Sequence, residues 1–146
     1  MNVNKNEFEV ESKERIYKIL IVDDEQEVLE SLRLTLKNAK DFRSEILTAN
    51  DGQAALEKMV SEDFDLVLAD YKMPGMNGVE FLSEVNDRHP KTARILITGY
   101  SDLDNAKDAI DNAIVEKYIE KPWHNQNLRE IILESLINKN NKIGLA

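Results

Sequence analysis

The sequence predicts an α/β protein with a five-stranded parallel sheet and helices on both of its faces. Five short apolar runs recur along the chain, and a stretch with helical periodicity follows each of them. Parallel strands need a crossover connection, and this connection is usually a helix that packs against the sheet. The regular alternation of strand and helix therefore favours a doubly wound sheet with five helices.

The predicted strands are rich in β-branched or aromatic residues, which fit the pleated surface of a sheet. The two most hydrophobic runs belong at the centre of the sheet, where helices cover both faces. The five runs span residues 16–22, 45–49, 64–69, 93–98 and 115–119.

The predicted helices show apolar residues three or four positions apart, which places these residues on one face. The last helix also carries a second stripe, Leu133 and Ile137, which indicates either a wider core-facing surface or a contact with a partner. From first helix to last, the main stripes are Val28, Leu29, Leu32 and Leu36; Ala55, Met59 and Val60; Phe81, Leu82 and Val85; Leu103, Ala106, Ile110 and Ala113; and Leu128, Ile131, Ile132 and Leu136.

Length and composition indicate one domain, expected at residues 16–138, between a flexible leader at 1–15 and a tail at 139–146. A net charge of −9 disfavours direct binding to nucleic acid, which requires that phosphates be neutralised, and disfavours anionic membranes. The chain has no cysteine, no signal peptide and no apolar run long enough to span a bilayer. We therefore expect a cytoplasmic protein that does not enter membranes.

Polar side chains follow the predicted strands at the points where the strands end. They are Asp23 and Asp24 after the first strand, Asp70 after the third, Thr98 at the end of the fourth, and Lys121 with Pro122 after the fifth. The carboxyl ends of parallel strands meet at one edge of the sheet, where ligands of such folds bind. We therefore expect three acids, a hydroxyl and a lysine at one site.

Three clustered carboxylates repel one another unless a cation lies between them, and a set of oxygen ligands favours Mg²⁺. An aspartate beside Mg²⁺ can attack a phosphoryl group and form an acyl phosphate. Lys121 and Thr98 would then donate to the phosphoryl oxygens. Each element alone also has a simpler interpretation, because an Asp-Asp pair often caps a helix and "PGMNG" is ordinary turn chemistry.

Four motifs resemble those of the receiver domain of bacterial two-component response regulators. They are "LIVDDE", "LADYKMPGMNG", "LITGYSD" and "YIEKPW", within a similarity that covers roughly residues 16–137. The resemblance implies the flavodoxin-like strand order 2-1-3-4-5 and phosphorylation of Asp70 by a sensor histidine kinase. It also implies an Mg²⁺ site formed by Asp23, Asp24, Asp70 and the backbone carbonyl of Lys72. Lys121 and Thr98 would bind the phosphoryl group, and the bond from Lys121 to Pro122 would be cis.

The resemblance further implies a switch in which Thr98 moves toward the phosphoryl group and Tyr118 swings inward. The fourth helix, fifth strand and fifth helix would then signal to an output protein or domain, with a homodimer through the same surface as a further expectation. Such a module is not an enzyme, because it catalyses only its own phosphorylation and dephosphorylation. Two alternatives stay open: a small Mg²⁺-dependent phosphatase of the haloacid dehalogenase type, and a docking module that works without phosphorylation.

Overall fold

The computed structural model describes the backbone of residues 15–144 and the side chains of residues 15–138. It contains one parallel sheet with the strand order β2-β1-β3-β4-β5. The strands are β1 (Ile16–Val22), β2 (Arg43–Ala49), β3 (Leu66–Asp70), β4 (Ala93–Thr98) and β5 (Lys117–Glu120). The predicted fold class and strand order are both confirmed. The predicted leader, apart from Arg15, lies outside the described residues.

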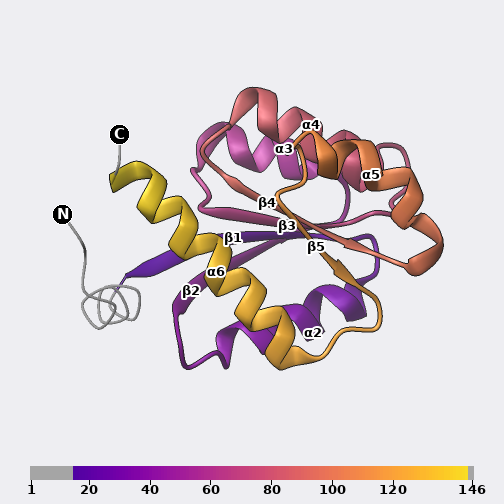
Figure 1. Ribbon diagram of the computed structural model, residues 1–146. Helices are drawn as coiled ribbons and strands as arrows, with labels where there is room; N and C mark the ends of the chain where they lie inside the picture. The colour runs from indigo at the N-terminus through magenta and orange to yellow at the C-terminus, as the bar shows by residue number, and fades with distance from the viewer. Residues whose placement is uncertain (1–14, 145–146) are drawn as a thin grey trace.

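The described region contains five α-helices and one short 3₁₀ helix. They are α2 (Gln26–Lys37), α3 (Gly52–Ser61), α4 (Gly78–Arg88), η1 (Tyr100–Asp102), α5 (Leu103–Asp111) and α6 (Asn125–Gly144). Helices α2 and α6 cover one face of the sheet, and α3, α4 and α5 cover the other (Figure 1). The core therefore consists of two apolar layers separated by the sheet.

The burial of the strands follows their position in the sheet. Every residue of β3 and of β4 is buried, as expected for parallel strands covered by helices on both faces. The edge strands β2 and β5 are more exposed, and each has one buried residue, Ala49 in β2 and Ile119 in β5. Burial of the apolar runs thus places β3 at the centre of the sheet, and Asp70, its last residue, next to β1 and β4.

Two of the predicted helix faces need correction. Val60 is 81% exposed, because the buried face of α3 is formed by Ala55, Leu56 and Met59 instead. Ala113 lies beyond the end of α5, at a left-handed φ of 60°, so that it does not belong to a helix face. Ala109 is the residue that α5 buries in its place.

Helix α6 extends to Gly144, six residues beyond the point at which we ended the predicted domain. Leu133 is partly buried and packs against the core layer that α6 shares with α2, which favours the wider core-facing stripe at this position. In the part of the chain that the structure describes, no helix is both long and apolar enough to cross a membrane.

Candidate metal and phosphoryl site

The predicted site residues occupy the carboxyl ends of four neighbouring strands. Because β1, β3, β4 and β5 are adjacent in that order, Asp23, Asp70, Thr98 and Lys121 follow one another along one edge of the sheet. The backbone N–H of Lys121 donates to the carbonyl of Thr98 at 3.0 Å, so these two residues are directly joined. The peptide bond between Lys121 and Pro122 is cis, as the resemblance implied.

Three carboxylates form a tight cluster at this edge. Asp23, Asp24 and Asp70 each place one oxygen within 4.8 Å of the others. Asp23 and Asp70 are almost completely buried, whereas Asp24 is exposed. Asp23 Oδ1 accepts a hydrogen bond from the N–H of Glu25 at 2.9 Å, but Asp23 Oδ2 is buried and has no hydrogen-bond partner among the described residues. A buried carboxylate oxygen without a donor is destabilising unless another group compensates it.

Burial changes the acidity of this cluster. The pKa of Asp23 is raised from 3.8 to about 6, mainly by desolvation and also by the charge of Asp70, while the hydrogen bond from Glu25 opposes the shift. Desolvation also raises the pKa of Asp70, although Lys121 opposes this effect. The orphaned Asp23 oxygen and the oxygen-only donors of the cluster fit a hard divalent cation such as Mg²⁺, which takes carboxylate ligands and retains water. The residues present at this edge are therefore compatible with a divalent cation.

Lys121 provides the cation that already faces the cluster. Its Nζ lies 2.6 Å from Asp70 Oδ1. Burial lowers the pKa of Lys121, but the hydrogen bond and the charge of Asp70 outweigh this effect, so that the pKa is raised overall. Lys121 therefore remains an ammonium group and partly neutralises the buried carboxylate.

Among the described residues, neither of the two predicted switch residues has a side-chain hydrogen bond to Asp70. Thr98 is fully buried, and its hydroxyl donates to the carbonyl of Gly99 at 3.1 Å. Tyr118 is 40% exposed on the edge strand β5. The structure thus brings together the three acids and Lys121, while the Thr98 hydroxyl is bonded to Gly99 and the Tyr118 side chain is partly exposed.

The loop after Asp70 depends on Gly78, whose role the sequence analysis missed. A Cβ at Gly78 would lie 2.3 Å from the backbone carbonyl oxygen of Asp70, so α4 can begin this close to the site only with glycine. Asn77 and Glu80 form a capping box at the same helix end. An Asn followed three residues later by Glu is visible in the sequence as a helix start and would have indicated this feature.

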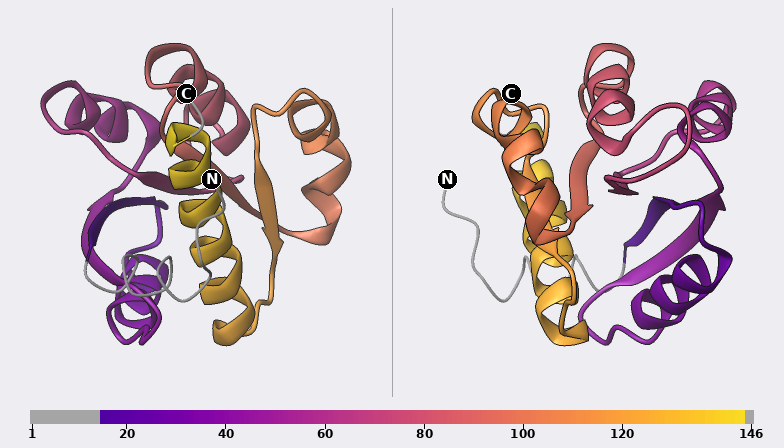
Figure 2. Two further views of the ribbon diagram at one scale, coloured as in Figure 1. Left: turned by 60° about the vertical axis from the view of Figure 1, so that its left-hand side comes forward. Right: turned by 90° about the vertical axis from the view of Figure 1, so that its right-hand side faces the viewer.

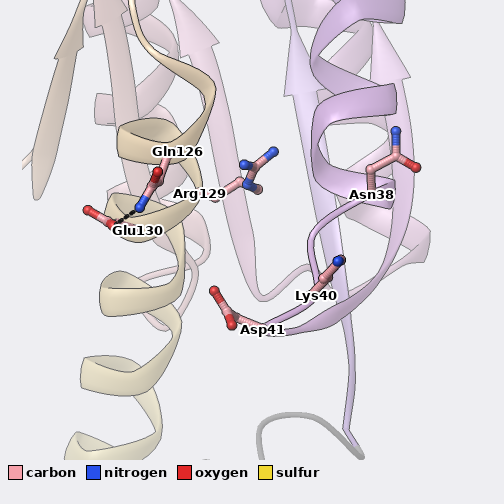
Figure 3. Close-up of a pocket in the computed structure, with 6 residues that line it drawn as sticks. All are labelled: Asn38, Lys40, Asp41, Gln126, Arg129 and Glu130. Carbon is pink, nitrogen blue, oxygen red and sulfur yellow. Dashed lines mark hydrogen bonds between the residues drawn. The ribbon is translucent and has the colours of Figure 1, made fainter.

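A polar hollow of about 270 Å³ lies between α6 and the segment that joins α2 to β2 (Figure 3). Within it, Gln126 donates to Glu130 at 3.1 Å. The lining residues are Asn38, Lys40, Asp41, Gln126, Arg129 and Glu130. None of them is a predicted site residue, so this hollow and the acidic cluster are separate features.

The raised pKa of Asp23 predicts how stability depends on pH. Between about pH 4 and 6 the folded protein holds a proton on Asp23 that the unfolded chain has lost, so the contribution of Asp23 to stability falls as the pH rises. Asp23→Asn is expected to raise the free energy of unfolding by about 2 kcal/mol at pH 7.5 in metal-free buffer, and by much less at pH 4. Urea denaturation in EDTA at both pH values measures this difference.

The matched control is Asp87→Asn, which makes the same chemical change at an exposed position of α4. We expect it to alter stability by less than about 0.5 kcal/mol at either pH. If Asp23→Asn and wild type had the same stability at pH 7.5, the assignment of a destabilising buried charge to Asp23 would be wrong.

Comparison with known proteins supports one family. Residues 19–133 match the family described as "Response regulator receiver domain". The hydrogenase transcriptional regulatory protein HoxA of Cupriavidus necator is 35% identical over 81% of this chain and 24% of its own length. The response regulator protein PilR of Pseudomonas aeruginosa is 36% identical over 82% of this chain and 26% of its own length. This chain therefore spans about a quarter of each of these two relatives.

Solved structures agree with this match. A CheY-like response regulator receiver domain protein from Methanospirillum hungatei is 33% identical to the chain, with a TM-score of 0.77. The alignment covers 88% of this chain and 99% of that structure. The similarity thus extends over the whole of a solved single-domain structure.

Proposed function

The chain belongs to the response regulator receiver domain family of two-component signalling, and on that premise we propose that Asp70 accepts a phosphoryl group from a sensor histidine kinase. The observation that carries the proposal is the pairing of buried Asp70 with Lys121 at 2.6 Å inside a cluster of three carboxylates. A carboxylate so placed has a cation beside it, and its neighbours fit a divalent metal. These are the requirements for phosphoryl transfer to an aspartate.

The transfer exchanges one bond to phosphorus for another. A carboxylate oxygen of Asp70 attacks the phosphorus of the phosphohistidine, and the new oxygen–phosphorus bond gives an acyl phosphate. The phosphorus–nitrogen bond breaks, its electron pair stays on the imidazole nitrogen, and that nitrogen takes a proton from water. Lys121 holds the carboxylate in place and donates to the phosphoryl oxygens as their charge develops.

Asp23, Asp24 and Asp70, whose oxygens form a cluster, would hold Mg²⁺ together with the backbone carbonyl of Lys72, which the family resemblance implies. When bound, Mg²⁺ neutralises charge on the phosphoryl oxygens. The Thr98 hydroxyl then turns from the carbonyl of Gly99 to the phosphoryl group. The space that Thr98 leaves accommodates the Tyr118 ring, which is partly exposed in the present structure. The local change of charge thereby becomes a change in surface shape.

The altered surface comprises α5, β5 and α6. We propose that an output protein or domain contacts this surface, and that two copies of the chain form a homodimer through it. The relatives are regulators about four times as long as the matched region, which is consistent with separate output parts in those proteins. The net charge of −9 argues against direct contact of this domain with nucleic acid. We place the domain in the cytoplasm, as a signalling module and not an enzyme with turnover.

The phosphatase alternative requires an acid two residues after the nucleophile. This chain has Lys72 at that position, with its side chain 75% exposed and directed toward Asp102. Family membership and this lysine both favour the receiver. The docking alternative differs from our proposal in one measurable respect, which is that Asp70 would remain unmodified.

The test is the intact mass of the chain after incubation with acetyl phosphate, with and without Mg²⁺. We expect one added phosphoryl group that requires the metal and is removed by hydroxylamine, because acyl phosphates react with this nucleophile. Turnover of small phosphate esters would favour the phosphatase. An unchanged mass with acetyl phosphate and with phosphorylated histidine kinases would contradict the proposal and favour the docking module.

A further inference from the structure

Helix α5 is the most weakly attached helix beside the site. It buries only two alanines, Ala106 and Ala109, while Leu103 and Ile110 are partly exposed. Small side chains remove little apolar surface from water and therefore hold a helix weakly. Figure 2 shows α5 next to β5. This strand lies at the edge of the sheet and pairs with β4 only. An element of this kind can change position without disturbing the rest of the core.

The C-terminal end of α5 is nevertheless firmly held. The guanidinium of Arg94, on β4, is 7% exposed and donates to the carbonyls of Ala113 and Ile114 at 3.2 and 2.9 Å. The N–H groups of Ile114 and Val115 both donate to the carbonyl of Ala109. These bonds join the end of the helix to the central sheet, so any movement of α5 must pivot at this end.

The N-terminal end of α5 is held differently. Asp102 occupies the N-cap position, but its carboxylate accepts no hydrogen bond from the first turn of the helix. Instead, Asp102 Oδ2 lies 4.0 Å from the ammonium of Lys72, and the side chain of Asp102 is only 14% exposed. Lys72 belongs to the loop after β3 and follows Asp70 by two residues. The pair thus connects the loop that carries the phosphoryl acceptor to the free end of α5.

We propose that the ion pair between Lys72 and Asp102 is a latch that holds α5 in the unphosphorylated state and opens when Asp70 is phosphorylated. This inference rests on the proposed function. Phosphorylation replaces the single negative charge of the Asp70 carboxylate with a phosphoryl group of about −2, a gain of about one negative charge within reach of the same loop. Lys72 is 75% exposed and flexible, and its pairing with a single carboxylate is weak, so the more highly charged group attracts it away from Asp102. The N-terminal end of α5 is then released while Arg94 retains the other end.

Hydrogen exchange of the backbone amides of residues 102–106 measures the latch directly. We expect these amides to exchange about threefold faster in unphosphorylated Asp102→Asn than in wild type, because the latch is open in the variant. Phosphorylation with acetyl phosphate and Mg²⁺ should accelerate exchange in wild type and add little in the variant. The intact mass of each sample reports how much of it is phosphorylated.

Lys72→Met separates the latch from a general effect of the charge of Asp102 on the helix dipole. If the pair is the cause, Lys72→Met accelerates the same amides, and the double variant exchanges no faster than either single variant. Acceleration by Asp102→Asn alone would overturn the latch. The matched control is Glu84→Gln, which removes the exposed partner of Arg88 on α4 and should leave α5 unchanged.

The two proposals fail in different ways. A wild-type chain that gains no phosphoryl group would overturn the proposed function, and the release step with it. The latch alone would be overturned if the wild-type protein gains the phosphoryl group but phosphorylation accelerates amide exchange by the same factor in wild type and in Asp102→Asn.

Discussion

Asp70→Asn is expected to eliminate the phosphoryl adduct while the chain remains folded. An amide oxygen is a much weaker nucleophile than a carboxylate and cannot form a stable acyl phosphate. The asparagine oxygen can still accept a hydrogen bond from Lys121, and it removes a carboxylate whose pKa is raised by burial, so the fold should be at least as stable as in wild type. Intact mass after incubation with acetyl phosphate and Mg²⁺ measures the adduct, and thermal unfolding measures the fold.

Asp87→Asn is the matched control, since it makes the same change on an exposed position of α4 and should leave the adduct at its wild-type level. The unfolding curve is recorded on the same sample, because unfolded Asp70→Asn protein would lack the adduct whether or not Asp70 is the acceptor. An adduct of equal yield in folded Asp70→Asn would show that another side chain is the acceptor, and would contradict the assignment of Asp70.

The apolar runs located all five strands, but the exact bounds were correct for only two of them. Strands β1 and β4 match the predicted runs residue for residue. Strand β3 begins at Leu66 and not at Phe64, because Phe64 is buried in the preceding segment while Asp65 accepts a hydrogen bond from the N–H of Lys18. Strand β2 begins two residues earlier than expected, since an edge strand includes polar residues that interrupt the apolar pattern.

The helix faces were less predictable where the buried side chains are small. The predicted stripe of α5 ran through Ala106 and Ile110, but the buried face is formed by Ala106 and Ala109, so the stripe lay one position to the side of the true face. Val60 carries a strong apolar signal, but it lies about 100° around the helix from Met59 and outside the buried face. Periodicity identifies a helix reliably, but it locates the edge of the buried face only to within one residue.

The position of the site followed from topology, but its contacts did not. The rule that ligands bind at the carboxyl ends of parallel strands placed Asp23, Asp70 and Lys121 together. The contact between Lys72 and Asp102 joins the loop after β3 to the last residue of η1, and neither segment carries a sequence signature for it. The direction of the Thr98 hydroxyl is likewise a matter of side-chain conformation, which a pattern of residue types does not specify.

Arg94→Met is expected to lower the free energy of unfolding by about 3 kcal/mol, because the variant leaves several backbone carbonyls without their donor. Arg94 is the second residue of β4, its side chain is only 7% exposed, and its guanidinium lies 3.2 Å from Glu116. Methionine fills the space of the side-chain stem but provides no hydrogen-bond donor. Urea denaturation measures the loss. The carbonyls that Arg94 serves are those of Pro90, Thr92, Ala113 and Ile114.

Two variants separate the hydrogen bonds of Arg94 from its charge. Arg94→Lys retains the charge but has one donor group in place of a planar fork, and we expect it to recover less than half of the lost stability. Arg88→Met removes an exposed arginine that pairs with Glu84 and should change stability by less than about 0.5 kcal/mol. If Arg94→Lys recovered all of the lost stability, charge alone would hold the end of α5. That result would contradict the assignment of a pivot formed by the hydrogen bonds of Arg94.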